Sequence, residues 1–349
     1  MCLKLVRTGV LWGLVMLLLA ACAPQPEPVI HQESFVFGTR VEVLVAGVPP
    51  DRANAAAAEV LREFDRLHRT YHAWQPSALS ALNEAIAAGR PYEVSAELAE
   101  WIRTAQQIAV RSGGLFDPGI GRLIALWGFQ SDTFAPRLPD AAQLAAWRAA
   151  HPSIVDLTLT GRQVTSRNRA VALDFGGFLK GVALDRAADL LRARGIHNAL
   201  INIGGNVLAL GDKGGRPWRV GIQHPRATAP LAVLDLRDGE AIGTSGDYQR
   251  YFELDGRRYC HLLDPRTAEP AQGTQAVTLL IPPGKDAGMR SDALSKPLFL
   301  AGAHWQQEAA RLGVTQALRI DAAGVLFVTP ALRQRLTMQG GEVPVVVTP

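Results

Sequence analysis

The sequence predicts a mixed α/β protein, in which helices and strands alternate without a regular strand–helix–strand rhythm. Three observations support this fold class. The chain has 349 residues, of which 48% are apolar and 19% charged, a globular composition that excludes a disordered chain or a coiled coil. Apolar residues recur at helical spacing in some segments and alternate in others. The 33 glycines and 22 prolines supply many turns.

The N-terminus has the pattern of an exported lipoprotein. Two basic residues precede an apolar run over residues 10–21, which is too short to span a bilayer comfortably as a permanent helix. Small residues end the run directly before Cys22, the pattern in which the thiol becomes lipidated. We expect a signal peptide over 1–21 and a proline-stiffened tether over 22–34. The protein would then be lipid-anchored to a bacterial membrane and face the periplasm; an ordinary signal peptide is the alternative.

The cysteines, the net charge and the histidines exclude several kinds of site. Cys2 lies in the expected signal and Cys22 would carry lipid, so Cys260 is the remaining thiol of the folded part. An intrachain disulfide and a cysteine-based metal site are therefore excluded. The net charge of +4 is too small to indicate nucleic-acid binding. His68 and His72 lie four residues apart, but without a third ligand nearby we expect no zinc site.

Five helices are predicted, and most begin or end at a recognisable residue. In the first, apolar residues recur at spacings of four, three and four. Ser95 and Asp140 are N-cap residues of the second and third, Gly195 closes the fourth, and Pro297 lies near the start of the fifth. The helices are expected over residues 51–71, 95–111, 140–151, 178–194 and 292–312.

Strands are predicted where apolar residues alternate or where β-branched residues gather between turns. Strands are expected over residues 198–210, 218–223, 231–236 and 248–254, and over 36–45 with an interruption at residues 38–39. Hairpins are expected over 156–173 and 317–328. A folded domain of two lobes is expected over 35–335, followed by a C-terminal tail over 336–349. The usual glycine fingerprints of dinucleotide-binding and P-loop proteins are absent from the sequence.

Polar segments, most of them glycine-bearing, fall at the ends of these elements, where backbone N–H groups and short side chains can meet a ligand. Each has a plain structural explanation, such as a tight turn at glycines 176–177. Their joint occurrence in one order carries more information than any one of them. The segments are residues 37–39, 74–83, 113–118, 174–181, 244–248, 261–267 and 291–296.

Together these segments resemble the FAD:protein FMN transferases, the ApbE-like flavin-transferase lipoproteins, from about Phe35 to about Gly302. Matching stretches include residues 116–129, 174–191, 201–207, 217–225, 244–252 and 259–267. The resemblance implies an α/β fold with two lobes, mixed sheets and packed helices, and FAD bound between the lobes. It also implies that FAD is split at its pyrophosphate, AMP is released, and FMN is attached through a phosphoester to a Thr or Ser of an acceptor flavoprotein subunit in a membrane electron-transfer complex.

The resemblance also implies roles for particular residues. His261 would take the proton of the acceptor hydroxyl. The alternatives are that Asp264 contributes more, or that His261 only orients phosphate. Gly177 and Asp292 would hold Mg²⁺ through a carbonyl and a carboxylate. Residues expected to bind the cofactor are Phe37, Trp74, Leu115, Phe116, Asp117, Asp174, Lys180, Leu263 and Ser295.

Two positions depart from the family pattern. Lys296 stands where the family has a threonine that helps to hold the metal, and a protonated lysine is no metal ligand. Its ammonium group would either occupy the place of the ion or point away from it. Ala268 stands where a glycine is usual, and a left-handed backbone would be awkward there for alanine. An FAD-binding lipoprotein with weak or lost transfer is therefore the alternative function, and a solute-binding lipoprotein is a third class.

Overall fold

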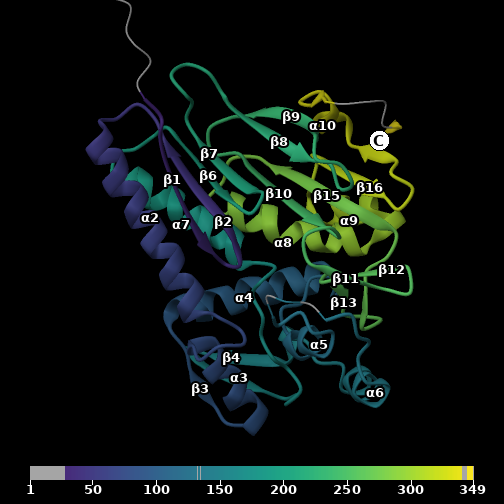
Figure 1. The fold of residues 1–349 in the computed structure, drawn as a ribbon. Coiled ribbons are helices and arrows are strands. Elements are labelled where there is room, and N and C mark those ends of the chain that lie inside the picture. The colour runs from purple at the N-terminus through teal and green to yellow at the C-terminus, as the bar shows by residue number, and fades with distance from the viewer. Residues whose placement is uncertain (1–27, 132, 134, 340–343, 349) are drawn as a thin grey trace, which may run out of the picture.

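The computed structural model describes residues 28–131, 133, 135–339 and 344–348 (Figure 1). The expected signal peptide, Cys22 and the first part of the tether lie outside the described residues. Within them, no helix is both long and apolar enough to cross a membrane.

A nine-stranded sheet forms the larger lobe, in the order β1-β2-β6-β7-β10-β15-β16-β17-β19. Its neighbouring strands are antiparallel except for β17 and β19, which pair in parallel. Three of the pairings, β1–β2, β6–β7 and β16–β17, join strands connected by short turns, so these turns set much of the register. The strands are β1 (Ile30–Val36), β2 (Thr39–Val45), β6 (Ala199–Ile203), β7 (Asn206–Leu210), β10 (Ala241–Gly246), β15 (Thr274–Ile281), β16 (Ala317–Asp321), β17 (Leu326–Val328) and β19 (Val345–Val347).

Helices pack on this sheet: α2 on its first strands, α7 on β6 and β7, and α8 on β7, β10 and β15. They are α2 (Pro50–Thr70), α7 (Leu179–Ala193) and α8 (Ala287–Leu300), followed by η2 (Gly302–His304) and α9 (Trp305–Leu312). Helices α7 and α8 approach closely because Gly181 faces Gly288. A Cβ on Gly181 would lie 2.4 Å from the carbonyl oxygen of Gly288. This contact places the start of α7 beside the first turn of α8.

A second apolar core includes β10, β15 and the small sheet β18-β9-β8. Alternate residues of β8 are buried, and its Trp218 is 3% exposed. The strands are β8 (Trp218–Gln223), β9 (Pro230–Leu236) and β18 (Thr337–Met338), and α10 (Pro330–Arg333) lies beside them. Figure 1 shows β8 and β9 next to α10 at the upper end of the molecule.

The second lobe is built from the middle of the chain and lies below the large sheet in Figure 1. Part of it has a separate apolar core, which includes Trp127, Trp147, Phe252 and Tyr259, whereas its first two helices pack into the core of the large sheet. Later segments therefore return to complete it. Its elements are α3 (Ala78–Ala88), β3 (Tyr92–Glu93), α4 (Ala96–Arg111), α5 (Gly121–Leu126), α6 (Ala141–Ala150), η1 (Ile154–Asp156), β4 (Leu157–Thr160), β5 (Gln163–Ser166), β11 (Tyr251–Leu254), β12 (Arg257–Cys260), β13 (Leu263–Asp264) and β14 (Glu269–Pro270).

Four of the predicted helices, those over 51–71, 95–111, 140–151 and 178–194, are confirmed to within about two residues at each end. Turns divide three other predicted segments. The interruption expected at residues 38–39 is the turn between β1, which ends at Val36, and β2, which begins at Thr39. The single strand predicted over 198–210 was wrong, because the chain turns there at two glycines with φ of 58° and 93°. Residues 292–312 are largely helical, as predicted, but they belong to two helices, α8 and α9, and Pro297 lies in the last turn of α8.

Two domain boundaries also differ from expectation. The tether was expected to reach residue 34, but β1 begins at Ile30 and pairs along its whole length with β2. The expected tail over 336–349 contains β18, which pairs with β9, and β19, which pairs with β17. Strands β18 and β19 are two and three residues long, which is too short to give a sequence pattern. They are identified as strands through their pairing with β9 and β17.

Candidate active site

A cavity of about 1000 Å³ is lined by residues of both lobes. The lining comes from the β1–β2 turn, the end of α2, the segment before α5, the start of α7, strands of the large sheet and the segment after β12. These segments are far apart in the sequence. The predicted site residues that line it are Phe37, Trp74, Leu115, Phe116, Asp117, Asp174, Gly177, Lys180, His261, Leu263 and Lys296.

Two predicted residues, Ser295 and Asp292, do not line the cavity but lie behind its wall on α8. The Ser295 hydroxyl lies 2.7 Å from the Ser245 hydroxyl and donates to the Asp292 carbonyl at 2.7 Å. Ser295 is buried and supports Ser245, which does line the cavity, and its contact with the cofactor stays a prediction. The sequence could not show this, because the contact joins two serines that lie 50 residues apart in the chain.

The Asp292 carboxylate is fully buried and both of its oxygens have partners. Oδ2 accepts a hydrogen bond from the Gly181 backbone N–H at 2.9 Å, and Oδ1 contacts the Lys296 ammonium group. Burial alone would raise the pKa of Asp292, but the neighbouring Lys296 and Lys180 hold it below its usual range. The carboxylate is therefore ionised and paired with a lysine, and the residues do not present it to a divalent metal.

His261 lies in the cavity wall directly after β12. Its Nδ1 atom is 3.2 Å from the backbone carbonyl oxygen of Arg250. Burial lowers the pKa of His261 to about 3, and the positive charges of Arg250 and Lys180 act in the same direction. The imidazole is therefore neutral near neutral pH, which is the state required of a general base.

Asp264, the alternative base, is placed less favourably. It does not line the cavity, although Leu263 and Pro265 on either side of it do. Its carboxylate accepts hydrogen bonds from the Arg266 guanidinium at 2.7 Å and 3.0 Å. Paired in this way it holds the segment after β13, so the geometry favours His261 as the base.

Besides Arg219 on β8, three cationic residues line the cavity: Lys180 from α7, Lys296 from α8 and Arg250 from the segment before β11. Burial lowers the pKa of Lys180, whereas the charge of Asp292 raises it. Arg250 was not among the predicted residues, although it lies within the matched stretch 244–252. Its guanidinium donates to the Phe129 carbonyl at 2.8 Å and lies 5.7 Å from the centre of the Trp74 ring. A wall with three cations suits a ligand that carries a diphosphate.

The turn into α7 brings backbone close to the same wall. Asp174 accepts a hydrogen bond from the Gly176 N–H at 2.8 Å, and the buried residues Phe175 and Phe178 of the same turn also line the cavity. Burial raises the pKa of Asp174. Gly176 and Gly177 line the cavity, so the N-terminal end of α7 faces it. Helix N-termini favour bound anions, because their backbone N–H groups point outward.

The Asp117 carboxylate is engaged in hydrogen bonds within the protein. Its carboxylate accepts hydrogen bonds from the Ile154 N–H at 2.9 Å, the Gly119 N–H at 2.7 Å and the Ser153 hydroxyl. Burial raises its pKa. The carboxylate joins the segment before α5 to η1, and this joint supports Leu115 and Phe116 in the cavity wall.

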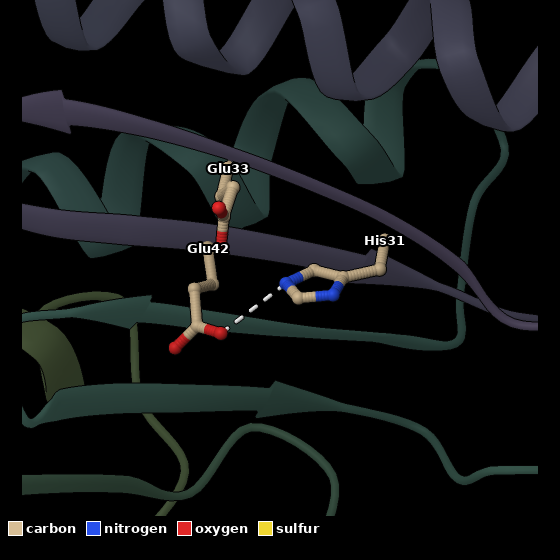
Figure 2. A group of neighbouring side chains, drawn as sticks. All are labelled: His31, Glu33 and Glu42. Carbon is tan, nitrogen blue, oxygen red and sulfur yellow. Dashed lines mark ion pairs between the residues drawn. The ribbon is translucent and has the colours of Figure 1, made fainter.

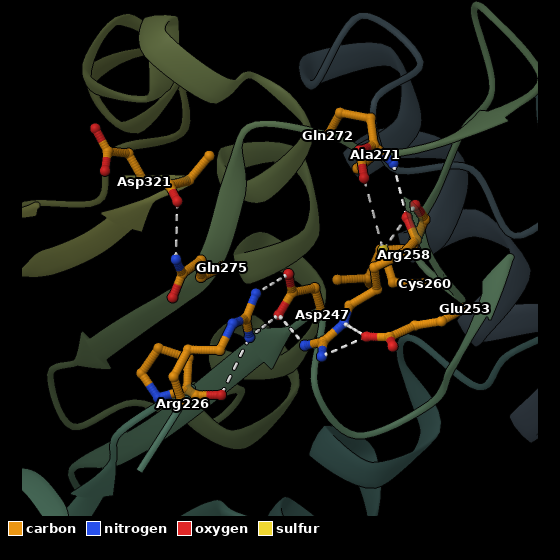
Figure 3. A network of polar contacts seen from close by, with 12 residues as sticks. Arg226, Asp247, Glu253, Arg258, Cys260, Ala271, Gln272, Gln275 and Asp321 are labelled. Atoms are coloured by element: carbon orange, nitrogen blue, oxygen red, sulfur yellow. Dashed lines mark hydrogen bonds and ion pairs between the residues drawn. The ribbon is translucent and has the colours of Figure 1, made fainter. Parts of the chain in front are cut away.

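A polar network holds the segment that carries Arg250 (Figure 3). Asp247 accepts two hydrogen bonds from the Arg226 guanidinium, at 2.7 Å and 2.6 Å. Its backbone N–H donates to the Gln275 carbonyl at 3.0 Å. The next three residues, 248–250, line the cavity. The Arg226–Asp247 pair, which joins the β8–β9 loop to the end of β10, therefore positions part of the site.

Two other groupings of possible metal ligands among the described residues do not form a metal centre. His31, Glu33 and Glu42 lie together on β1 and β2 (Figure 2). Arg40 pairs with both carboxylates, at 2.9 Å to Glu33 and 2.6 Å to Glu42, so the group is an ion-pair network. The rings of His68 and His72 are 5.0 Å apart, but the described residues bring no third histidine, cysteine or carboxylate into a common site with them.

Comparison with known proteins agrees with this geometry. Residues 37–318 match the ApbE family. An FAD:protein FMN transferase of Rhodobacter capsulatus is 43% identical over 324 residues, covering 93% of this chain and 61% of that protein. The chain thus spans less than two thirds of that relative's length. An FAD:protein FMN transferase of Klebsiella pneumoniae (strain 342) is 33% identical, over 79% of each chain.

A solved structure gives the same result. The crystal structure of the ApbE protein from Thermotoga maritima has a TM-score of 0.80 and 29% identity, and the match covers 88% of this chain and 99% of that one. The fold class predicted from the sequence is thereby confirmed. The chain belongs to the ApbE family of FAD:protein FMN transferases.

Proposed function

We propose that the cavity between the lobes binds FAD, and that the protein transfers the FMN half to a Thr or Ser hydroxyl of a partner flavoprotein, releasing AMP. The observation that carries this proposal is that His261, Lys296 and the pair Asp174 and Lys180, which come from three separate segments, line one cavity. Its volume of about 1000 Å³ lies at the upper end of the range for ligand pockets and suits a dinucleotide.

The transfer is a displacement at phosphorus. The acceptor hydroxyl loses its proton to Nε2 of His261, and its oxygen bonds to the phosphorus of the FMN half. The bond from that phosphorus to the bridging oxygen breaks, and AMP leaves with that oxygen. Phosphoryl transfer depends mainly on positioning and charge neutralisation, which the two lysines and Arg250 supply here. Trp74 and Phe37 provide aromatic surfaces for the flavin or adenine ring.

Magnesium was expected from the resemblance, but the residues do not fit it in the way that the resemblance implies. Asp292 is paired with Lys296 and with the Gly181 N–H, and the family's threonine is replaced by that lysine. No step of the proposed mechanism passes through a metal ion.

We further propose that Cys22 carries lipid, that the protein faces the periplasm from a bacterial membrane, and that its acceptor is a flavoprotein subunit of a membrane electron-transfer complex. The support is the small-residue sequence directly before Cys22 and the proline-containing segment after it. Expression of the full chain and of Cys22→Ser, followed by membrane fractionation and lipid labelling, tests the anchor. Label on the wild type and none on the variant is the expected result; equal labelling contradicts the proposal.

The test of transfer uses purified protein, FAD and an acceptor subunit that contains the target Thr. Covalent flavin fluorescence on the acceptor in a denaturing gel, with AMP released in equal amount, is the expected result. The replacement of the family threonine by Lys296 favours one alternative, an FAD-binding lipoprotein without transfer. FAD binding with neither AMP release nor labelled acceptor would support that alternative instead.

A further inference from the structure

We propose that the ammonium group of Lys296 is a built-in cation of this site and replaces a divalent ion beside the diphosphate of FAD. The inference rests on the proposed function only for the identity of the ligand. It concerns how this chain supplies positive charge at one end of the cavity.

The position of Lys296 carries the proposal. Lys296 is four residues after Asp292 on α8, so both side chains leave the same face of the helix. Its Nζ atom contacts the Asp292 carboxylate and donates to the Asp292 backbone carbonyl at 2.8 Å. The side chain then passes Gly177, where a Cβ would lie 3.3 Å from Lys296 Cε. The lysine therefore fills the space between the two residues that would hold an ion.

The carboxylate and carbonyl oxygens of Asp292 already accept hydrogen bonds, so few of their lone pairs are left to coordinate a metal ion. The carboxylate binds the Gly181 N–H and the Lys296 ammonium group, and the carbonyl accepts from Lys296 and from the Ser295 hydroxyl. Mg²⁺ needs near-octahedral oxygen ligands at about 2.0–2.1 Å. An ion here would first have to displace the lysine, which is covalently tethered and already paired.

The lysine also reaches the ligand side of the wall. Its side chain is 15% exposed, whereas the Asp292 side chain is 0% exposed, and Lys296 lines the cavity together with Lys180 and Gly177. The Lys296 ammonium group, which is paired with the Asp292 carboxylate, therefore belongs to the cavity lining that also contains Lys180 and Arg250.

FAD and Mn²⁺ binding, measured without any acceptor, test the proposal. Isothermal titration gives the affinity for FAD, and electron paramagnetic resonance gives the amount of bound Mn²⁺. For the wild type treated with EDTA we expect the same FAD affinity as with added Mg²⁺, and no stoichiometric Mn²⁺ binding with or without FAD. Loss of FAD affinity on EDTA treatment, or one Mn²⁺ bound per chain, would overturn the proposal.

Two variants separate the charge of Lys296 from its bulk. Lys296→Met keeps the apolar stem and removes the charge, and Lys296→Thr adds a hydroxyl ligand. Without metal, both should bind FAD about tenfold more weakly, the loss of one charge-assisted contact. In Lys296→Thr, Mg²⁺ should restore the affinity and Mn²⁺ should bind. Weakened binding in Lys296→Thr but not in Lys296→Met, or no Mn²⁺ bound by Lys296→Thr, would contradict the proposal.

Lys285→Thr is the matched control, because Lys285 is exposed and lies just before α8. It should bind FAD like the wild type and gain no Mn²⁺. Since none of these measurements needs an acceptor, failure of the transfer reaction leaves their outcome intact. Conversely, transfer that requires added metal would refute the role of Lys296 while supporting the proposed function.

Discussion

The Nδ1 atom of His261 lies 3.2 Å from the backbone carbonyl oxygen of Arg250. A carbonyl oxygen only accepts hydrogen bonds, so this contact places the imidazole proton on Nδ1. Nε2 then carries the lone pair that can receive a proton. The same residue, Arg250, contributes its guanidinium to the cavity wall. One segment therefore orients the base and supplies positive charge.

Replacing His261 tests its role as the base. His261→Ala should reduce FMN transfer by about a hundredfold or more, the usual contribution of a general base. The affinity for FAD should change little, since the cationic wall remains. Transfer is measured as covalent flavin on the acceptor, and affinity by titration. Loss of FAD binding in the variant would instead indicate a structural role, and exposed His304→Ala is the control.

The lowered pKa of His261 predicts a dependence of stability on pH in the protein without FAD. The pKa is about 3 in the folded state and about 6.5 in an unfolded chain. Between these values the unfolded chain binds the extra proton, so the free energy of unfolding falls as pH drops from about 6.5 toward 3. In His261→Gln this contribution disappears. Urea unfolding at several pH values should show a smaller acid loss in the variant; parallel curves would contradict the assignment.

The Arg226–Asp247 pair should matter for binding more than for stability. Arg226→Ala removes both hydrogen bonds to Asp247 and frees residues 248–250 of the cavity wall, so FAD affinity should fall by about tenfold. The unfolding free energy should fall by about 1 kcal/mol, as for a partly exposed ion pair. Arg226→Lys should be intermediate, because it keeps the charge but not the paired geometry. Arg216→Ala, at an exposed position, should match the wild type in FAD titration; equal loss there would refute the role of the pair.

The close approach of α7 and α8 should not tolerate a methyl group. In Gly181→Ala the new Cβ would meet the Gly288 carbonyl oxygen at 2.4 Å and the Asp292 Cβ at 2.7 Å. Separating the helices should cost about 3 kcal/mol of unfolding free energy, measured in urea. Gly177→Ala is the matched comparison, since its Cβ would meet only the flexible Lys296 side chain, and at 3.3 Å or more. Similar losses in both variants would show that helix contact is not the cause.

Sequence reasoning worked best where a signal is local. The Ser95 cap of α4 and the glycine that closes α7 were recognisable, because a helix end depends on the residues within one turn of it. The ordered motifs identified most of the side chains that line the cavity. Even Ala268 was identified as unusual, and the structure gives it a left-handed backbone with φ of 61°.

Contacts between distant segments escaped the same reasoning. Arg250 and the Arg226–Asp247 pair were missed because nothing near them in the chain says what they face. Strands β18 and β19 are too short to show a period, and their partners β9 and β17 are about 100 and 20 residues away. The position of Ser295 behind the cavity wall involves a hydrogen bond to Ser245, which lies 50 residues earlier in the chain.

By itself, the sequence determined the mixed fold class, the family and the set of residues from which a dinucleotide site is made, since turn glycines, caps and motif order are written along the chain. Only the tertiary structure decided which of those groups are paired with a neighbour and which carry a lone pair that can accept a proton. Whether Lys296 meets Asp292 or solvent, and which nitrogen of His261 is free, depends on how α7, α8 and the segment before β11 pack together. Packing sets distances and burial, and these in turn set charge state and hydrogen-bond partners.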